Sequence, residues 1–147
     1  MFWDEIKNLF VKKPSDNRHT RILVIEDNLV DQKIAEAAIN RGGYSSLLAC
    51  DGQSGLAMAR EHKPDLIILD YNLPDNIGPD ICKALKLDET TSRIPVLFLT
   101  SMTSPESIVN CYAQGGINYL AKPIDLKFLL KQIDQALNET KTEESNF

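Results

Sequence analysis

Two unbroken apolar runs restrict most strongly how this chain can fold. The first is Asp65-Leu66-Ile67-Ile68-Leu69-Asp70, and the second is Ile94-Pro95-Val96-Leu97-Phe98-Leu99-Thr100. A strand that stays apolar along its whole length is covered on both faces, which is typical of a parallel sheet flanked by helices. The sequence therefore predicts these runs as central strands, and Pro95 fits among a strand's first residues.

Strand and helix patterns alternate around these two runs. Further strands are expected at Arg21–Ile25, at Tyr44–Cys50 as a weaker edge strand, and at Ile117–Ala121. Helical spacing of apolar residues separates the strands, and Asp125 can cap the last helix. Five strand-helix units predict an α/β fold, a flavodoxin-like doubly wound parallel sheet of strand order 2-1-3-4-5 with helices on both faces.

The predicted domain occupies residues 20–139 of the 147 residues, between a leader and a tail. Residues 1–19 read as an amphipathic helix and a hinge at Pro14–Asn17, and residues 140–147 read as a polar tail. The leader is expected to cover apolar surface on this domain, on a second copy in a homodimer, or on a partner. Its large apolar residues fall within an arc of about 120° at roughly 100° per residue: Phe2, Trp3, Ile6, Leu9 and Phe10.

Composition excludes several classes of protein. A net charge of −5 argues against a nucleic-acid binder, because such proteins carry a clustered excess of Lys and Arg. No apolar run is long enough for a membrane span or a signal peptide, so a cytoplasmic protein is expected. Cys50, Cys82 and Cys111 suggest neither a disulfide framework nor a zinc site, and we expect buried or half-buried thiols.

Acidic residues follow two of the predicted strands. Glu26 and Asp27 come after the first strand, and Asp70 ends the third. These strands are neighbours in the flavodoxin-like order, so their ends bring three carboxylates into one crevice. Like charges at that spacing repel unless a cation joins them, and oxygen ligands are those that Mg²⁺ prefers. The backbone carbonyl of Asn72 could supply one more oxygen ligand.

Two more groups at the strand ends complete a site for phosphoryl transfer. Mg²⁺ keeps several waters and bridges to phosphate, so Lys122 would serve as a second positive charge when a phosphoryl group arrives. Thr100 can donate its hydroxyl to the same group. Asp70 lies at the centre of the crevice and is the natural nucleophile, since this transfer needs positioning and charge neutralisation.

The order of these motifs resembles the receiver domain of two-component response regulators of the single-domain type, over roughly Thr20 to Glu139. The motifs that carry the resemblance are Glu26-Asp27, Asp70, Pro74, Gly78, Thr100 and Lys122-Pro123.

The resemblance implies a signalling switch rather than an enzyme in the ordinary sense. A sensor histidine kinase or a phosphotransfer protein would pass a phosphoryl group from phosphohistidine to Asp70, and autodephosphorylation would reset the switch. Thr100 and Tyr119 would change position, the face formed by the fourth helix, last strand and last helix would reorganise, and a downstream protein would dock. The resemblance also implies a cis peptide bond between Lys122 and Pro123.

One segment departs from the family pattern, and three other functions are compatible with parts of the sequence. Asp75-Asn76-Ile77 lacks the family's common apolar pattern, which leaves the contacts of that loop open. A flavin or nucleotide site would need anion donors in the first turn, where Glu26-Asp27 repels phosphate. An aspartyl phosphatase usually has an acid where Asn72 stands. A receiver-like scaffold that binds partners without phosphorylation stays open as the alternative.

Overall fold

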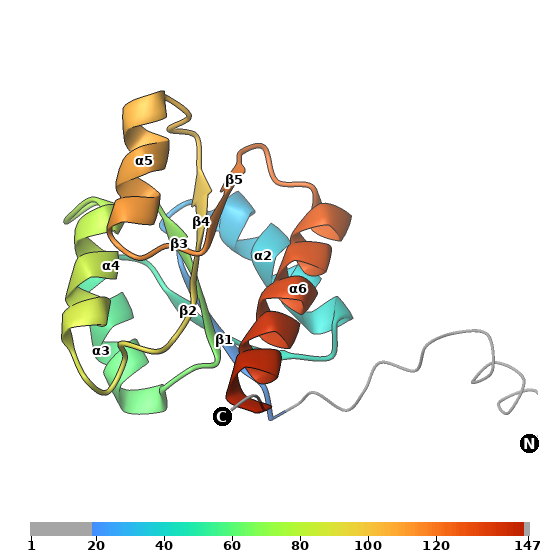
Figure 1. The fold of residues 1–147 in the computed structure, drawn as a ribbon. Helices are drawn as coiled ribbons and strands as arrows, with labels where there is room; N and C mark the ends of the chain where they lie inside the picture. The colour runs from blue at the N-terminus through green and yellow to red at the C-terminus, as the bar shows by residue number, and fades with distance from the viewer. Residues whose placement is uncertain (1–18, 146–147) are drawn as a thin grey trace, which may run out of the picture.

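A computed structural model of the chain describes residues 19–145 (Figure 1). The predicted amphipathic helix and the hinge at Pro14–Asn17 lie outside the described residues.

The five strands form one parallel sheet. They are β1 (Arg21–Ile25), β2 (Ser45–Ala49), β3 (Leu66–Asp70), β4 (Val96–Thr100) and β5 (Asn118–Ala121). Their order across the sheet is β2-β1-β3-β4-β5, so the predicted order and the edge position of β2 are confirmed. The carboxyl ends of all five strands consequently lie along one edge of the sheet.

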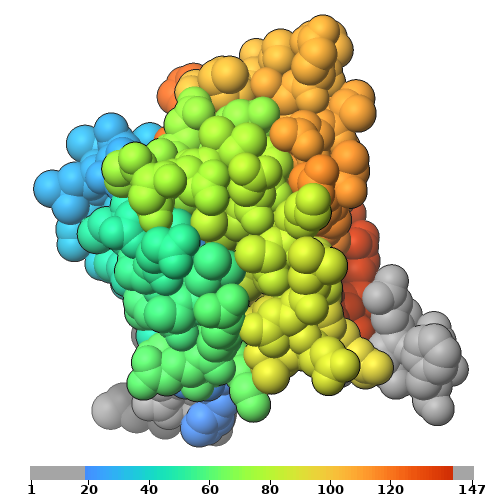
Figure 2. Space-filling model, turned by 90° about the vertical axis from the view of Figure 1, so that its left-hand side faces the viewer, coloured from blue at the N-terminus to red at the C-terminus, as the bar shows by residue number. Residues whose placement is uncertain are grey.

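Helices cover both faces of this sheet, as predicted. The helices α2 (Leu29–Arg41) and α6 (Leu126–Ser145) lie on one face (Figure 1). The helices α3 (Gly52–His62), α4 (Gly78–Leu87) and α5 (Pro105–Ala113) lie on the other, and Figure 2 shows the surface that these three form. Parallel strands need such crossover connections, which is why helices and strands alternate along the chain.

The sheet divides the core into two apolar clusters. Every residue of β3 and β4 is buried, which explains their unbroken apolar sequences. Side chains alternate between the two faces, so Ile68 packs toward α2 and α6 whereas Ile67 packs toward α3, α4 and α5. Burying each such side chain stabilises the fold by about 1.5–3 kcal/mol.

Side-chain caps fix where the helices begin. Asn28 accepts a hydrogen bond from the backbone N–H of Asp31 at the start of α2, and Asp51 accepts one from Ser54 at the start of α3. The predicted cap Asp125 accepts a hydrogen bond from the N–H group of Phe128, and Ser104 accepts one from Ser107 at the start of α5. Each cap satisfies a donor that the helix leaves unpaired.

Two expectations from the sequence need adjustment, one about the end of α6 and one about Cys50. α6 continues to Ser145, beyond the boundary expected at residue 139, because a helix can continue on Lys and Glu after its apolar spacing has ended. Cys82 and Cys111 are buried as expected, and burial raises the pKa of each thiol to about 11. Cys50, which directly follows β2, is exposed, contrary to expectation.

Among the described helices, none has the length and apolar character that crossing a membrane requires.

Candidate functional site

The ends of β1 and β3 bring three carboxylates together. Glu26 and Asp27 directly follow β1, and Asp70 is the last residue of β3. One oxygen from each of the three lies within 4.8 Å of the others. Glu26 and Asp70 are buried, and Asp27 is exposed at the mouth of the crevice. This grouping follows from β1 and β3 being hydrogen-bonded neighbours in the sheet.

Glu26 is the most deeply buried of the three carboxylates, with 2% of its surface exposed. Its Oε1 accepts a hydrogen bond of 3.0 Å from the N–H of Asn28. Its Oε2 forms an ion pair with Lys122 but receives no properly oriented hydrogen bond from the described residues. Burial raises the pKa of Glu26 to about 7, although Lys122 and Asn28 oppose the shift. A buried carboxylate oxygen that faces a positive charge fits a cation ligand.

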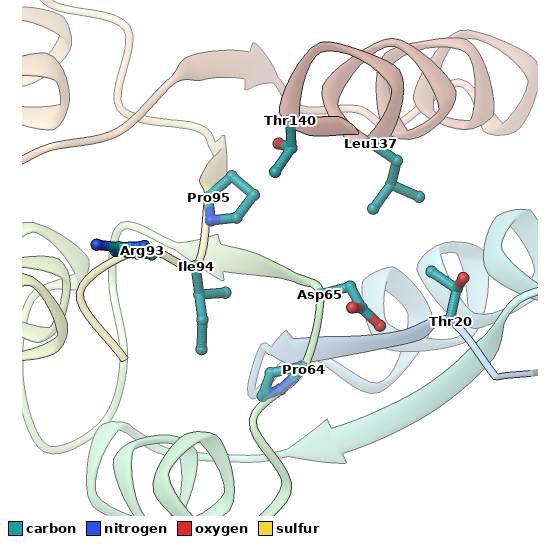
Figure 3. A pocket seen from close by; sticks show the side chains of 8 residues that line it. All are labelled: Thr20, Pro64, Asp65, Arg93, Ile94, Pro95, Leu137 and Thr140. Carbon is teal, nitrogen blue, oxygen red and sulfur yellow. The ribbon is translucent and has the colours of Figure 1, made fainter. Parts of the chain in front are cut away.

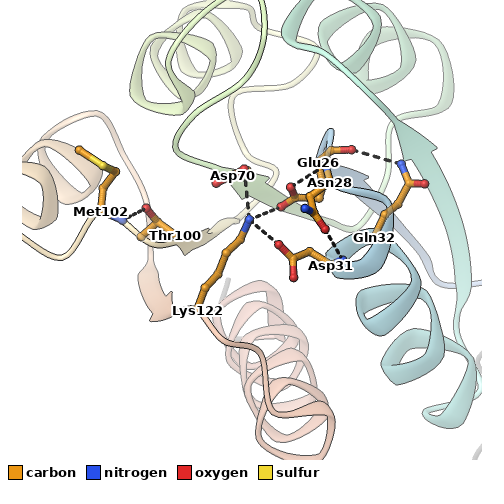
Figure 4. A network of polar contacts seen from close by, with 8 residues as sticks. All are labelled: Glu26, Asn28, Asp31, Gln32, Asp70, Thr100, Met102 and Lys122. Carbon is orange, nitrogen blue, oxygen red and sulfur yellow. Dashed lines mark hydrogen bonds and ion pairs between the residues drawn. The ribbon is translucent and has the colours of Figure 1, made fainter.

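Lys122, which follows β5, reaches across the crevice to three carboxylates (Figure 4). Its Nζ lies 2.9 Å from Glu26 Oε2, 2.9 Å from Asp31 Oδ2 and 3.2 Å from Asp70 Oδ2. Burial lowers the pKa of Lys122, but the three carboxylates more than offset this effect and raise it above its usual range. The ammonium is therefore engaged before any phosphoryl group arrives, a contact that nothing in the sequence predicts.

Asp31 is the residue of this network that sequence reasoning missed. It lies in the first turn of α2, where an acidic residue is ordinary because it favours the helix dipole. The only signal that could have revealed it is topological, since the start of α2 and the end of β5 both border the crevice.

Thr100 and Tyr119 lie on the β4 and β5 side of the site. Thr100 is fully buried, and its Oγ1 accepts a hydrogen bond of 2.8 Å from the N–H of Met102 (Figure 4). Tyr119 is half-buried, and its ring lies edge-on to Tyr112 on α5, with 6.2 Å between the centroids. The peptide bond between Lys122 and Pro123 is cis.

The loop after Asp70 is held by contacts that the sequence left open. Asn72 pairs with Ile77 in an antiparallel bridge, which closes the loop into a turn. Both carboxylate oxygens of Asp75 accept hydrogen bonds from the start of α3, at 2.7 Å from Gly52 N and 3.0 Å from Gln53 N. The bond from Gly52 is the main cause that lowers the pKa of Asp75.

Gly78 shows how closely the same loop packs against the strand of Asp70. A Cβ atom at position 78 would lie 2.2 Å from the carbonyl oxygen of Asp70. The N–H of Gly78 also donates to the carbonyl of Tyr71. A side chain at this position would push the loop away from the crevice.

A second hollow lies at the opposite end of the strands (Figure 3). This cavity of about 240 Å³ is lined by Thr20, Pro64, Asp65, Arg93, Ile94, Pro95, Leu137 and Thr140. Asp65 accepts a hydrogen bond from the N–H of Arg21, so its carboxylate is used in holding β1 beside β3. The groups suited to phosphoryl chemistry meet at the other end of the sheet.

Comparisons with known proteins identify the family of this chain. Residues 22–134 match the response regulator receiver domain. The chain is 34% identical over 117 residues to Protein PilH of Pseudomonas aeruginosa, covering 80% of this chain and 97% of PilH. It is 35% identical over 120 residues to the DNA-binding dual master transcriptional regulator RpaA of a Synechocystis species, covering 82% of this chain. The match spans only 50% of the length of RpaA.

The fold is likewise similar to a solved receiver structure that holds a metal. The Mn²⁺-bound form of response regulator Rcp1 superposes with a TM-score of 0.67 at 26% identity, covering 79% of this chain and 90% of Rcp1. Receiver domains are signalling switches that act as phosphoacceptors, bind Mg²⁺ in an acidic pocket, and interact with histidine kinases or phosphotransfer proteins. With its family match and its acidic crevice, the chain belongs to the response regulator receiver domains.

Proposed function

We propose that this protein accepts a phosphoryl group on Asp70 from a phosphohistidine, in the presence of Mg²⁺, and passes the signal on by docking to another protein. The observation that carries the proposal is the convergence at Asp70. Carboxylate oxygens of Glu26 and Asp27 lie within 4.8 Å of an Asp70 oxygen, and Lys122 Nζ lies 3.2 Å from Asp70.

The carboxylates of Glu26, Asp27 and Asp70 and the backbone carbonyl of Asn72 are the proposed Mg²⁺ ligands. The Oε2 atom of Glu26, which lacks a hydrogen bond from the described residues, supports this assignment. The Mn²⁺-bound form of Rcp1 supports the choice of a divalent ion. Bound Mg²⁺ would offset the negative charge of the crevice and attract phosphate oxygens.

Transfer would proceed by attack of an Asp70 carboxylate oxygen on the phosphorus atom of the phosphohistidine. The new O–P bond forms as the P–N bond breaks, and the histidine nitrogen keeps the electron pair. Lys122 would hold an oxygen of the phosphoryl group, since its ammonium already borders Asp70. Thr100 would donate its hydroxyl to another oxygen after leaving its contact with Met102.

The proposed output surface lies on α5, β5 and α6. Four large apolar side chains are exposed on these elements and the short segment before β5: Val109, Tyr112, Ile117 and Phe128. Together these side chains would offer apolar surface to a docking protein. Thr100 at the end of β4 and Tyr119 on β5 connect this surface to the crevice, so their movement would alter it when Asp70 is phosphorylated.

The test is incubation with acetyl phosphate and Mg²⁺, read by intact mass. We expect one phosphoryl group on the wild type, none after chelation of Mg²⁺, and none on Asp70→Asn. Asp80→Asn, a matched change at an exposed acid on α4, should leave labelling unchanged. A wild type that gains no mass would favour a scaffold that binds partners without phosphorylation. An Asp70→Asn protein that still gains mass would place the phosphoacceptor at another residue.

A further inference from the structure

Among the residues that the structure describes, Asp31 is the one ion-pair partner of Lys122 outside the carboxylate cluster suited to a metal. That cluster, among the described residues, consists of Glu26, Asp27 and Asp70. Asp31 approaches Lys122 from α2, and its Oδ2 lies 2.9 Å from the ammonium. The N–H of Asp31 is itself fixed by a hydrogen bond of 3.0 Å to the Asn28 side chain. The start of α2 thus holds this carboxylate against Lys122.

Lys122 is already surrounded by more negative charge than its one ammonium can balance, although the proposed function requires that ammonium to bind a phosphoryl group. The Lys122 side chain is 15% exposed, and its one ammonium faces the carboxylates of Glu26, Asp31 and Asp70. A divalent cation can take over the charge of Glu26 and Asp70, because both belong to the metal cluster. Asp31 would keep its hold on Lys122 even then. A phosphoryl group must therefore compete with Asp31 for the ammonium.

We propose that Asp31 is a positioning residue that holds Lys122 on the α2 side of the crevice and thereby slows phosphorylation of Asp70. This inference rests on the proposed function. Asp31 contributes in two ways: it occupies the ammonium, and its own negative charge repels the incoming dianion. During transfer Lys122 exchanges the Asp31 carboxylate for a phosphoryl oxygen. The ion pair that joins α2 to the residue after β5 is then broken.

Asp31 suits a substitution test because its side chain is 21% exposed. Asn at position 31 has the same shape and leaves the backbone N–H available to Asn28. The pair is partly open to solvent, so its loss should change the rate moderately. We expect Asp31→Asn to be phosphorylated by acetyl phosphate and Mg²⁺ about two- to fivefold faster than the wild type.

The matched control is Glu36→Gln on the same helix. Glu36 pairs with Lys33 at 3.7 Å, so the change removes one negative charge from α2 without touching Lys122. We expect the wild-type rate from this variant. Asp31→Glu, which restores the charge, should return the rate toward the wild-type value.

A double-mutant cycle decides whether Asp31 acts through Lys122. In a Lys122→Ala background, the gain from Asp31→Asn should shrink to the part that comes from repulsion between Asp31 and the dianion. A gain of the same size in that background would overturn the proposal, since Asp31 would then act only by its field. Equal rates for Asp31→Asn and the wild type would overturn it as well.

A second measurement separates this proposal from the proposed function. If the wild type takes no phosphoryl group, the proposed function fails. Urea unfolding without Mg²⁺ would still test the ion pair, with the wild type, Asp31→Asn, Lys122→Ala and the double variant. Coupling between positions 31 and 122 in the unfolding cycle would show that Asp31 holds Lys122, and additive effects would overturn that.

Discussion

Lys86 and Lys122 are both lysines with largely buried stems, but their ammonium groups lie at opposite ends of the parallel strands. Lys86 Nζ donates to the backbone carbonyls of Ile94 at 2.6 Å and Ser92 at 3.2 Å, just before β4. These acceptors are uncharged, and burial lowers the pKa of Lys86. Lys122 faces three carboxylates after β5, and its pKa is raised instead.

The two lysine environments show which end of the sheet is built for stability. Near Lys86, polar groups meet matching partners, as when Thr91 Oγ1 donates to the carbonyl of Leu85 at 2.7 Å. Near Lys122, one ammonium serves three carboxylates, and a buried oxygen of Glu26 lacks a hydrogen bond from the described residues. Imperfect pairing of charges at one end is expected where a site awaits a ligand.

The largest expected effect is the loss of Lys122. We expect Lys122→Ala to lower the rate of Asp70 phosphorylation by about a hundredfold, because one preorganised positive charge is removed from the transferred group. Rates with acetyl phosphate and Mg²⁺ provide the measurement. Lys127→Ala, at an exposed lysine on α6, is the control and should keep the wild-type rate. A Lys122→Ala rate within twofold of wild type would place that charge outside the reaction.

The next effect concerns pH and Glu26. Because the pKa of Glu26 is raised from 4.5 to about 7 in the folded state, the folded chain binds more protons between these values. Without Mg²⁺, the free energy of unfolding should therefore fall as pH rises through this window, by up to about 3 kcal/mol. Urea unfolding at pH 5 and pH 8 in chelator measures the change.

Glu26→Gln should show a smaller fall across the same pH range, because the neutral amide cannot ionise. Glu36→Gln on α2 provides the control and should follow the wild type. Parallel pH profiles for Glu26→Gln and the wild type would mean that Glu26 ionises without cost to the fold.

The smallest effect concerns Lys86, which lies at the opposite end of the strands from Lys122. Lys86→Ala should lower the free energy of unfolding by about 1–3 kcal/mol, since two carbonyls lose a charged donor. Its phosphorylation rate should equal that of the wild type, the reverse of the Lys122→Ala result. Lys83→Ala, at an exposed lysine on the same helix, is the control in urea unfolding. Equal stability of the two variants would remove the structural role of Lys86.

Much of the fold could be predicted because its signals are local. The apolar runs at β3 and β4 mark buried central strands, and the polar residues that follow mark their carboxyl ends. Once strand order is assumed, the meeting of Glu26, Asp27 and Asp70 follows from topology. The capping residue Asp125 was equally readable, because a cap and the N–H group that donates to it lie within one helical turn.

The missed contacts join residues far apart in sequence, and their local patterns point elsewhere. Asp31 reads as an ordinary first-turn acid, and nothing nearby in the sequence indicates a partner at Lys122. Asp75 reads as a turn residue, yet it accepts hydrogen bonds from the start of α3. The extra length of α6 was missed because apolar spacing marks where a helix packs, rather than where it ends.

The hydrogen bond between Met102 and Thr100 has a consequence for observing this protein at work. The hydroxyl oxygen of Thr100 is the acceptor for the amide of Met102, at 2.8 Å. If Thr100 turns toward a phosphoryl group on Asp70, that amide loses its acceptor and becomes open to solvent. Hydrogen exchange at the Met102 amide would therefore report the fraction of molecules in which Asp70 is phosphorylated.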